Sequence, residues 1–386
     1  MSVKRHYVLA AGGTGGHMMP AHALAVELMD RGHHVALITD ERGAKIPGLF
    51  ADVPVHILPA GRLGNSPLSL IRAARAIWAG RAMALRLYET FEPSAVVGFG
   101  GYPALPALLA AFKAKVPTAI HEQNAVLGRV NRYVAGKVNA IALGFPNVQR
   151  LKVRDAGKTH VVGNPVRPEV LALRDQPYPV IDSEGVLRVM VVGGSQGASI
   201  LSEIVPDGLA MLPPSLKRRL QVTQQCRAED IDAVRKRYAE LSIPADLATY
   251  MDDMPERLAW THLMIARSGA STVAELTVAG RPAILVPLPS ATDDHQTFNT
   301  AEIVESGGAR MITQRHFTPV ELAKQMQKLG LETEGLIAAA KRAWVCGRPH
   351  AAKDLADIVE GLSKPPVQDG LAAEGWQGGH LAGAGA

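Results

Sequence analysis

Residues 7–32 have the sequence YVLAAGGTGGHMMPAHALAVELMDRG, and this stretch decides the fold. The apolar run Tyr7–Ala10 is typical of a buried parallel strand. Gly12–Gly16 predicts a tight turn. Pro20–Met29 has the spacing of a helix, with a proline near its start and Gly32 just past its end. A strand, a glycine turn and a helix in this order predict the opening of a doubly wound α/β domain.

The same order of elements returns half a chain later. Leu187–Val192 predicts a buried strand, Gly193–Gly197 predicts a turn, and a helix is expected from Ala198 onward. The chain is therefore predicted to hold two Rossmann-like, doubly wound α/β domains. We place the boundary near Gly163–Pro168, where two prolines interrupt both the strand and the helix pattern.

Length and composition agree with this division. The 386 residues suit two domains, and 47% hydrophobic with 20% charged residues is typical of a soluble globular protein. The net charge of +5 (41 Lys+Arg minus 36 Asp+Glu) suggests anionic partners without choosing among nucleic acid, nucleotide and membrane. Cys226 and Cys346 are the only cysteines, which argues against a disulfide framework and favours a reducing compartment.

One uncharged stretch, Pro93–Phe112, is long enough to span a membrane. It begins with the strand-like run Ala95–Val97 and is interrupted by three glycines and two prolines. We therefore predict a buried strand, a glycine turn and an apolar helix there. The apolar run at the N-terminus is too short for the core of a signal peptide.

The first glycine loop, Gly12–His17, does not match the two common nucleotide-binding patterns. A dinucleotide fingerprint would need glycine where Met18 stands, and a Walker A loop would need a lysine followed by serine or threonine. Its backbone N–H groups can still face an anion at a helix N-terminus, although a tight turn without a ligand is the alternative. His17 follows the loop, and a positive helix end would keep its ring neutral and able to accept a proton. The alternative is a first-turn histidine with no catalytic role.

Further polar groups follow other predicted strands of the first domain. The loop Gly98–Pro103 follows Ala95–Val97, and His121–Asn124 follows the predicted strand Thr118–Ile120. The carboxyl edge of a parallel sheet is where α/β proteins bind ligands, so Asn124 is a candidate for ligand contact. For His121 and Glu122 the alternative is local hydrogen bonding between loops.

The second domain has its own candidates for binding a phosphate and a sugar. The loop Gly193–Ala198 offers backbone N–H groups and the Ser195 hydroxyl, and Arg167 could reach the same phosphate. Ser268–Thr272 opens a helix, and Glu275 lies about one turn inside it, where a carboxylate can accept hydrogen bonds from two sugar hydroxyls. The alternatives are a surface arginine at 167 and a surface charge or helix cap at 275.

Two acidic segments could suggest metal ions. Asp293–His295 has no partner cluster with matching spacing elsewhere in the chain. Asp230-Ile231-Asp232 resembles the acidic triplet of metal-dependent glycosyltransferases, but it lies in the charged helical stretch 228–240 instead of at a strand end. A solvated helix face is therefore the prediction there.

Seven segments, taken together, resemble a known family. In order and spacing they match the MurG family, the undecaprenyldiphospho-muramoylpentapeptide β-N-acetylglucosaminyltransferases of bacterial peptidoglycan synthesis, within glycosyltransferase family 28. The resemblance covers about residues 4–361. Ser271 departs from the pattern where some members have leucine, and Thr297 where some have a second glutamine. The segments are Gly12–His17, Gly98–Pro103, His121–Asn124, Gly163–Arg167, Gly193–Ala198, Arg267–Glu275 and Asp294–Gln296.

The resemblance implies a GT-B fold, in which two Rossmann-like domains face a cleft. It places an N-terminal acceptor (lipid I) and membrane-facing domain at residues 1–163 and a UDP-GlcNAc-binding domain at 164–345. A C-terminal helix at 346–364 is expected to pack back on the N-terminal domain. The Gly/Ala-rich tail, 365–386, is expected to be disordered.

The implied activity is that of an inverting hexosyltransferase. It would move GlcNAc from UDP-GlcNAc to the C4 hydroxyl of MurNAc in lipid I, the undecaprenyl-diphosphate-linked MurNAc-pentapeptide. The product, lipid II, supplies peptidoglycan synthesis and so cell wall growth, cell shape and cell division. No cofactor, metal or nucleic acid is implied. The expected place is the cytoplasmic face of the inner membrane, as a peripheral protein on an anionic surface, with cell-wall synthesis proteins as possible partners.

The resemblance also assigns roles to residues. His17 becomes the catalytic base. Met251 would meet the uracil through its backbone and Glu275 the ribose hydroxyls, while Arg167 and Ser195 would meet the diphosphate. Gln296 and Asn124 would contact the region of the donor sugar. The full set of expected donor contacts is Thr14, Gly15, Gly16, Asn124, Arg167, Ser195, Met251, Ala270, Ser271, Thr272, Glu275 and Gln296, and the expected acceptor or diphosphate loops contain Gly13, Gly15, Gly100, Gly101 and Tyr102.

The stretch Pro67–Tyr88 bears on how such an enzyme would reach a lipid. Apolar and basic residues interleave there at helical spacing, which predicts a basic amphipathic helix suited to an anionic membrane surface. Lys113 and Lys115 could add to the patch. An ordinary core-facing helix with a solvated basic face is the alternative. The apolar residues are Ile71, Ala74, Trp78, Ala82 and Leu85, and the basic ones are Arg72, Arg75, Arg81 and Arg86.

Two other functions remain open from the sequence. One is a different UDP-sugar enzyme of the same fold, with another acceptor or acting as a UDP-GlcNAc 2-epimerase. The other is a nucleotide-binding protein without turnover. A dinucleotide oxidoreductase is disfavoured because Met18 breaks the fingerprint.

Overall fold

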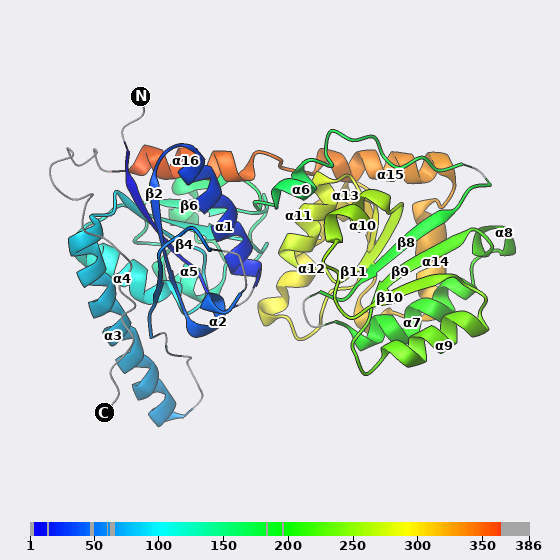
Figure 1. Ribbon diagram of the computed structural model, residues 1–386, viewed down its shortest axis with the longest axis horizontal. Helices are drawn as coiled ribbons and strands as arrows, with labels where there is room; N and C mark the ends of the chain where they lie inside the picture. The colour runs from blue at the N-terminus through cyan, green and yellow to red at the C-terminus, as the bar shows by residue number, and fades with distance from the viewer. Residues whose placement is uncertain are drawn as a thin grey trace. The chain divides into compact units, whose positions relative to one another are not determined.

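The computed structural model describes residues 4–13, 15–46, 50–59, 61, 66–182, 184–194 and 197–363 (Figure 1). These residues form two compact units. Unit 1 contains the described residues up to His121, Tyr133–Ala140 and those from Ala356 onward. Unit 2 contains Glu122–Arg132 and Ile141–Leu355.

The first sheet has seven strands in the order β3-β2-β1-β4-β5-β6-β7. The pairs β1–β2, β1–β4, β2–β3, β4–β5 and β6–β7 are all parallel. Because the order reverses between β1 and β4, the loops that follow these two strands lie at a topological switch point. The strands are β1 (His6–Ala10), β2 (His34–Thr39), β3 (Val55–Ile57), β4 (Ala95–Gly98), β5 (Thr118–Glu122), β6 (Ala140–Leu143) and β7 (Thr159–Val161).

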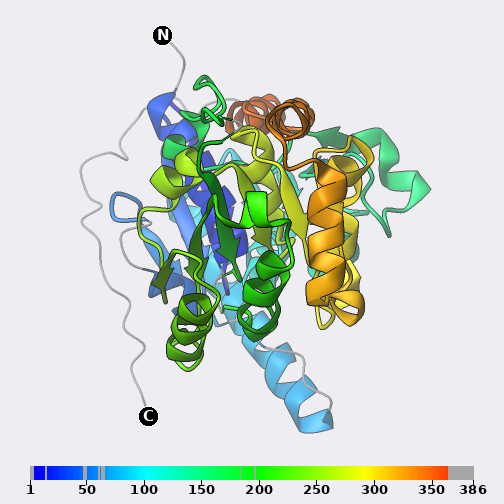
Figure 2. The same cartoon turned by 90° about the vertical axis from the view of Figure 1, so that its right-hand side faces the viewer.

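The helices of the first half differ from the prediction in one place. Helix α1 spans Gly15–Asp30, so it begins five residues before the predicted Pro20. Pro20 is tolerated in the second turn because the loss is a single backbone hydrogen bond, the one to the Gly16 carbonyl. As a result His17 lies in the first helical turn. The other helices are α2 (Glu41–Ala44), α3 (Pro67–Phe91), α4 (Ala104–Ala114) and α5 (Arg129–Val134), and Figure 2 shows one end of α3 extending beyond its neighbours.

The uncharged stretch 93–112 forms the predicted strand, turn and helix. Strand β4 is buried, and α4 packs against α3. Among the described residues, no helix combines the length and the apolar character that crossing a bilayer requires.

The second sheet has six strands in the order β10-β9-β8-β11-β12-β13, and every neighbouring pair is parallel. Its switch point lies between β8 and β11. The strands are β8 (Leu187–Val192), β9 (Leu220–Gln225), β10 (Ala245–Ala248), β11 (Leu263–Ala266), β12 (Ala283–Leu285) and β13 (Ala309–Met311). Together the two parallel sheets confirm the predicted pair of Rossmann-like α/β folds.

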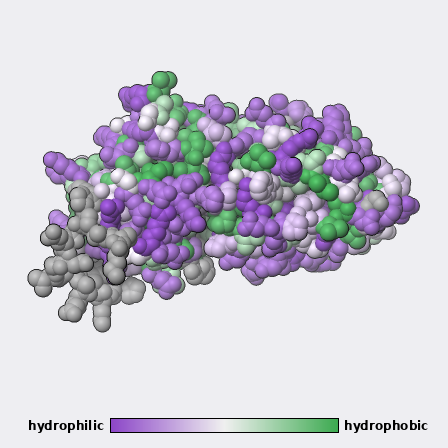
Figure 3. All heavy atoms as spheres, turned by 90° about the horizontal axis from the view of Figure 1, so that it is seen from above, coloured by the Kyte–Doolittle hydropathy of each residue, from purple (hydrophilic) through white to green (hydrophobic). Residues whose placement is uncertain are grey.

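Helices cover both faces of the second sheet. Helix α9 begins at Ile231, and the Asp232 side chain is 91% exposed, as expected for a solvated helix face. On the face shown in Figure 3, hydrophobic residues form small groups among hydrophilic ones. The helices are α6 (Pro168–Leu171), α7 (Ser199–Ala210), α8 (Pro214–Lys217), α9 (Ile231–Glu240), α10 (Met254–Trp260), α11 (Ala270–Val278), α12 (His295–Asn299), α13 (Ala301–Glu305), α14 (Pro319–Leu329), α15 (Thr333–Val345) and α16 (Ala351–Leu362), with 3-10 turns at Val153–Lys158, Thr292–Asp294 and Gln314–His316.

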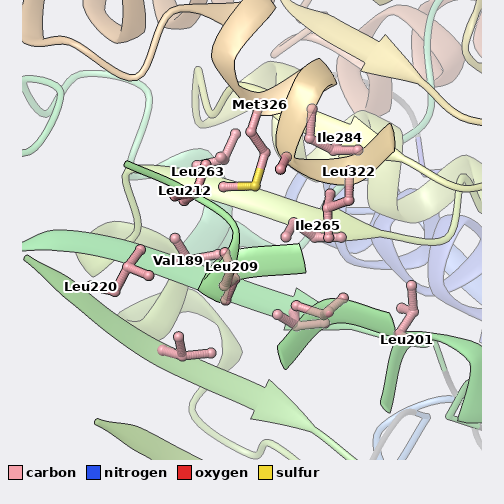
Figure 4. Close-up of a cluster of buried hydrophobic side chains, with 14 of the residues drawn as sticks. Val189, Leu201, Leu209, Leu212, Leu220, Leu263, Ile265, Ile284, Leu322 and Met326 are labelled. Atoms are coloured by element: carbon pink, nitrogen blue, oxygen red, sulfur yellow. The ribbon is translucent and has the colours of Figure 1, made fainter. Parts of the chain in front are cut away.

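The larger core of unit 2 fills one face of this sheet. Val189, Leu220 and Ile265 point from the strands toward α7 and α14, which contribute Leu209 and Met326 (Figure 4). All are almost completely buried. A second cluster covers the opposite face and includes Met190, Val192, Met251, Ala266 and Ala270. Alternate residues of each strand therefore belong to different layers, as pleating requires.

Helix α16 is fastened to the start of the first sheet by charged groups. Arg31 Nη1 lies 2.6 Å from both Asp357 Oδ1 and Glu360 Oε2. His33 Nδ1 accepts from the Arg5 N–H at 3.3 Å, so its Nε2 carries the proton and donates to Glu360 Oε1 at 2.6 Å. Burial alone would raise the pKa of Glu360, but the hydrogen bonds from His33 and Arg31 outweigh it and the pKa is lowered.

We predict that Glu360→Gln weakens this attachment in a pH-dependent way. Because the folded pKa is depressed, the carboxylate stabilises the fold above the ordinary value of about 4.3, and this contribution is lost as the pH falls through the folded value. The expected loss is about 1 kcal/mol at pH 7, since the group is partly exposed and screened. Urea unfolding at neutral pH and below pH 4 measures it. Glu89→Gln, at an exposed carboxylate on α3, is the control, and an equal effect of both variants would contradict the prediction.

Candidate functional site

In unit 1 the two predicted glycine loops lie against each other. A Cβ on Gly12 would fall 2.7 Å from Pro103 Cγ, so only glycine permits this approach. Gly100 and Gly101 have φ of +83° and +71°, which glycine adopts at little cost. The position of a Cβ on Gly101 is 3.4 Å from His17 Cδ2. The structure therefore brings His17 next to the Gly98–Pro103 loop at the carboxyl edge of the sheet.

The other predicted residues of these loops differ in accessibility. Gly15 and Gly16 are exposed in the first turn of α1, where backbone N–H groups lack helical partners. His17 and Tyr102 are half-buried. Thr14 lies outside the described residues.

Asp40 organises the first loop, and the sequence reasoning missed it. Its Oδ1 accepts hydrogen bonds from the N–H groups of Gly13 and Gly43, both at 3.0 Å, while Arg42 donates to Oδ2. Burial pushes the pKa of Asp40 upward, but these bonds outweigh it and the pKa is lowered. The Gly13 N–H is thus already in use, and what Gly13 adds to the loop is its φ of +86°. An aspartate directly after a strand and before a short helix is an N-cap signal that could have found Asp40.

In unit 2 a buried carboxylate holds the loop that contains Asn124. Strand β5 runs through Glu122, two residues beyond its predicted end, and both His121 and Glu122 are almost fully buried. The Glu122 carboxylate accepts from the N–H groups of Asn124 at 3.1 Å and Gly128 at 2.7 Å, and from Asn131 Nδ2 at 2.9 Å. Three donors explain why a charge is stable inside the protein. Local hydrogen bonding is therefore the role of Glu122.

Asn299 connects the Asn124 loop to the end of β11. Its side chain is completely buried. Oδ1 accepts from the Ala125 N–H at 2.8 Å, and Nδ2 donates to Asn124 Oδ1 at 3.2 Å and to the Ser268 carbonyl at 3.0 Å. Asn124 is thereby held beside the loop that opens α11. Sequence reasoning gave Asn299 no role, since its partners Asn124 and Ala125 lie some 175 residues earlier in the chain.

The N-terminus of α11 has the features of an anion site. Ala270, Ser271 and Thr272 form its first turn, and Gly269 at the N-cap position makes no side-chain cap. The first N–H groups of a helix lack partners within it and carry the positive end of its dipole. Ser271 and Thr272 are half-buried. This end of α11 can therefore receive an anionic or hydroxyl-rich group.

Two predicted site residues pair with each other across this helix. The Nε and Nη2 of Arg167 lie 3.2 and 3.1 Å from Glu275 Oε1. Burial raises the pKa of Glu275, and the Arg167 charge offsets this only in part. The structure thus brings Arg167 and Glu275 together, beside the first turn of α11.

The remaining predicted residues of unit 2 lie in nearby loops. Met251 is buried and belongs to the same hydrophobic cluster as Ala270. Gln296 ties two loops together: its Oε1 accepts from the Leu288 N–H at 3.0 Å, and its carbonyl accepts from Ser268 Oγ at 2.8 Å. Thr297 donates to Asp294 Oδ1 at 2.7 Å.

The Gly193–Gly197 turn has the predicted shape where it is described. Gly194 and Gly197 have φ of +82° and +67°, and a Cβ on Gly193 would fall 2.4 Å from the Ala198 nitrogen. Ser195, predicted to meet a phosphate, and Gln196 lie outside the described residues.

Neither a metal-binding cluster nor the hollow in unit 2 coincides with the predicted site among the described residues. In the described part of the chain, no three His, Cys, Asp or Glu side chains gather as a metal site would require. Asp293 forms ion pairs with Arg132 and Arg150. The hollow in unit 2 is lined by Asn164 and Arg348 among others, and the described residues around it include no predicted site residue.

Two family models match the chain. The glycosyltransferase family 28 N-terminal domain matches residues 7–143, and the glycosyltransferase family 28 C-terminal domain matches residues 188–360. Together they span more than half of the sequence. The chain belongs to glycosyltransferase family 28.

Curated relatives within family 28 are similar over nearly their whole length. A protein of Novosphingobium aromaticivorans is 66% identical over 368 residues, 95% of each chain. One of Erythrobacter litoralis is 64% identical, over 95% of this chain and 92% of its own. Both are named UDP-N-acetylglucosamine–N-acetylmuramyl-(pentapeptide) pyrophosphoryl-undecaprenol N-acetylglucosamine transferase. The resemblance seen in the seven segments is therefore confirmed.

Solved structures agree with the family 28 fold. The crystal structure of Acinetobacter baumannii MurG is 29% identical with a TM-score of 0.76, covering 92% of this chain and 99% of that one. A UDP-GlcNAc 2-epimerase from Neisseria meningitidis has a TM-score of 0.64 at 14% identity, covering 93% and 100%. At that identity the epimerase shows a shared fold alone. The expected GT-B architecture is thus confirmed.

We predict that Glu122→Gln destabilises this family 28 chain through the Asn124 loop. One amide oxygen cannot replace a carboxylate that serves three donors, so buried N–H groups would be left unpaired. The expected loss of unfolding free energy is about 2–4 kcal/mol, measured by urea unfolding. Glu169→Gln, at an exposed carboxylate of the same unit, is the control. Wild-type stability of Glu122→Gln would contradict the proposed role of the carboxylate.

Proposed function

We propose that this chain transfers GlcNAc from UDP-GlcNAc to the C4 hydroxyl of MurNAc in lipid I, forming lipid II for peptidoglycan synthesis. The observation that carries the proposal is the identity of 66% and 64% to two relatives named for this transfer, over at least 92% of each chain. The reaction is a single displacement. The acceptor hydroxyl attacks C1 of the donor sugar as UDP leaves, so the anomeric configuration inverts from α to β.

The donor end of the reaction is assigned to unit 2. The leaving diphosphate needs fixed positive charge, which Arg167, Ser195 and the helix after Gly197 would supply. The Glu275 carboxylate would accept the ribose hydroxyls, and Met251 would meet the uracil through its backbone. Ala270, Ser271 and Thr272 would contribute the first turn of α11, and Gln296 and Asn124 would border the sugar. The Arg167–Glu275 pair beside that turn supports these assignments.

The acceptor end is assigned to unit 1. His17 would take the proton of the C4 hydroxyl, since an imidazole within hydrogen-bond reach is a suitable general base near neutral pH. Thr14, Gly15 and Gly16 would complete the donor contacts. Gly13, Gly15, Gly100, Gly101 and Tyr102 would line the acceptor loops. The position of His17 Cδ2, 3.4 Å from where a Cβ on Gly101 would stand, supports grouping these loops at one place.

The domain roles follow from these assignments. Residues 1–163 would form the acceptor domain, 164–345 the donor domain and 346–364 a C-terminal helix that returns to the acceptor domain. The two family models, at 7–143 and 188–360, support the first two ranges, and the bonds of Arg31 to Asp357 and Glu360 support the third. The tail 365–386 lies outside the described residues.

The decisive experiment measures lipid II formation by the wild type and by His17→Ala. We expect the wild type to convert lipid I and UDP-GlcNAc into lipid II, with UDP released only when lipid I is present. We expect His17→Ala to bind UDP-GlcNAc with wild-type affinity. Its transfer rate should fall by about 10²–10⁴-fold, which is the usual contribution of a general base.

The controls separate the two parts of that proposal. His22→Ala, on the same helix α1, should keep activity. Transfer by His17→Ala at the wild-type rate would refute the role of His17 as the catalytic base and leave the proposed transfer reaction standing. A wild type that epimerises UDP-GlcNAc, or binds it without turnover, would overturn the proposed function.

Helix α3 supports a peripheral position on the cytoplasmic face of an anionic inner membrane. The predicted apolar residues Ile71 and Trp78 are 54% and 67% exposed, and so is Leu68 at 67%. The described buried positions of α3 include instead Ala73, Gly80, Ala84 and Tyr88, so the predicted apolar residues are not the ones that face the core. Arg72 and Arg75 are exposed beside the apolar residues, and Arg81 lies over the Trp78 ring at 5.1 Å. Other cell-wall synthesis proteins could use the same membrane surface.

We predict that Arg72→Glu with Arg75→Glu reduces binding to vesicles of mixed anionic and zwitterionic lipid. Basic residues near such a surface contribute about 1 kcal/mol each, so reversing two charges should lower the partition coefficient on the order of 30-fold or more at low salt. Sedimentation with vesicles measures this. Arg235→Glu with Lys236→Glu, on exposed positions of α9, is the matched control. Undiminished binding by the α3 variant would contradict the membrane assignment.

A further inference from the structure

Gln225 ends strand β9 with an unexplained buried oxygen. Only 8% of the residue is exposed. Its Oε1 is fully buried, and no residue in the described part of the chain donates a hydrogen bond to it. A buried acceptor without a donor destabilises the fold, so native structures retain few of them. We therefore look for a hydrogen-bond donor to this oxygen beyond the described residues, such as a bound ligand.

The pleat of β9 shows which layer Gln225 faces. Leu220, Val222 and Cys226 belong to the core cluster under α7 and α14. Successive side chains of a strand point to opposite faces, so Gln225 faces the other layer. Its neighbour in register is Ala248 of β10, which packs against that second cluster.

That second layer carries proposed donor-binding residues. Met251 follows Ala248 by three residues, and Met251 and Ala270 both belong to the cluster. The Cys226 N–H donates to the Ala248 carbonyl at 2.9 Å, which holds the ends of β9 and β10 side by side. Gln225 is thus at the carboxyl edge of the sheet, on the layer of the residue assigned to the uracil.

We propose that the Gln225 amide oxygen accepts a hydrogen bond from the nucleoside of UDP-GlcNAc. This rests on the proposed function. The diphosphate is an acceptor and offers no donor, whereas uridine has three: the uracil N3–H and the 2′ and 3′ hydroxyls of the ribose. Of the groups assigned to the sugar, Gln296 is bonded to Ser268 after β11, and Asn124 is linked to Ser268 through Asn299. β9 lies on the other side of β8 from β11 and next to β10, which leads to Met251, the residue assigned to the uracil; this favours the nucleoside over the sugar.

A structural role and a ligand-binding role predict opposite effects on the free protein. Gln225→Met keeps the size of the side chain and removes the amide. If Gln225 holds the fold, this variant lowers the melting temperature without ligand. If its oxygen instead binds the nucleoside, the variant without ligand is at least as stable as the wild type, because an unpaired buried oxygen has been removed.

The experiment compares wild type, Gln225→Met and the control Gln221→Met by calorimetric titration with UDP and by thermal unfolding. Gln221 lies on the same strand and is exposed. We expect Gln225→Met to bind UDP about 10-fold more weakly, as for loss of one buried hydrogen bond, with an unchanged or higher melting temperature. The control should match the wild type in both.

Three analogues identify the group that donates: N3-methyl-UDP, 2′-deoxy-UDP and 3′-deoxy-UDP. The analogue lacking the true donor should bind wild type and Gln225→Met equally, while the other two keep the 10-fold difference. Wild-type affinity of Gln225→Met for UDP, or a lowered melting temperature without ligand, would overturn the inference and leave the proposed function standing. A wild type that does not bind UDP would overturn the proposed function together with it.

Discussion

The structure depends on one constraint, the crowding of backbone at the carboxyl edge of each parallel sheet. All strands of a parallel sheet end at the same edge, so the loops that follow neighbouring strands emerge side by side there. In unit 1 a Cβ on Gly12 would collide with Pro103, and one on Gly98 would fall 2.7 Å from Leu108 Cδ1. In unit 2 a Cβ on Gly193 would meet the backbone of Ala198. The same close approach that requires glycine brings backbone N–H groups and polar side chains together at one edge.

This constraint explains why the fold was largely predictable from the sequence. Glycine after a short apolar run is a local signal, and it appears at Gly12, Gly98 and Gly193, each directly at or just beyond a strand end. Two boundaries were wrong. Helix α1 begins before Pro20, and β5 continues through Glu122. In the second case the strand was predicted to end at Ile120, before His121 and Glu122, yet the Glu122 carboxylate accepts hydrogen bonds from three donors that come later in the chain.

Contacts of the candidate site were predictable only where the residues that make them are close together in sequence. Glu275, one turn inside a helix that opens with small residues, could be proposed from spacing, and its role toward a ligand stays a prediction. Asp40 and Asn299 were missed, because each acts by binding loops from elsewhere: Asp40 holds the Gly13 N–H, and Asn299 holds Asn124 and Ser268. Such residues position the groups that we propose meet a ligand. Their importance comes from the bonds they make in the folded chain, which no local pattern encodes.

The Arg167–Glu275 pair shows how the site remains stable before a donor arrives. Glu275 is largely buried, and burial raises its pKa, so an isolated carboxylate there would tend to take up a proton. The Arg167 guanidinium counters this and keeps the carboxylate able to accept hydrogen bonds. Both groups are also the ones assigned to the donor, Glu275 to the ribose and Arg167 to the diphosphate. Donor binding would then exchange an internal ion pair for two ligand contacts: the diphosphate would offset the arginine charge, and the ribose hydroxyls would donate hydrogen bonds to the carboxylate. A buried pair that is satisfied in both states costs less than two charges held ready without partners, and this accounts for an arginine and a glutamate 108 residues apart being brought within 3.1 Å.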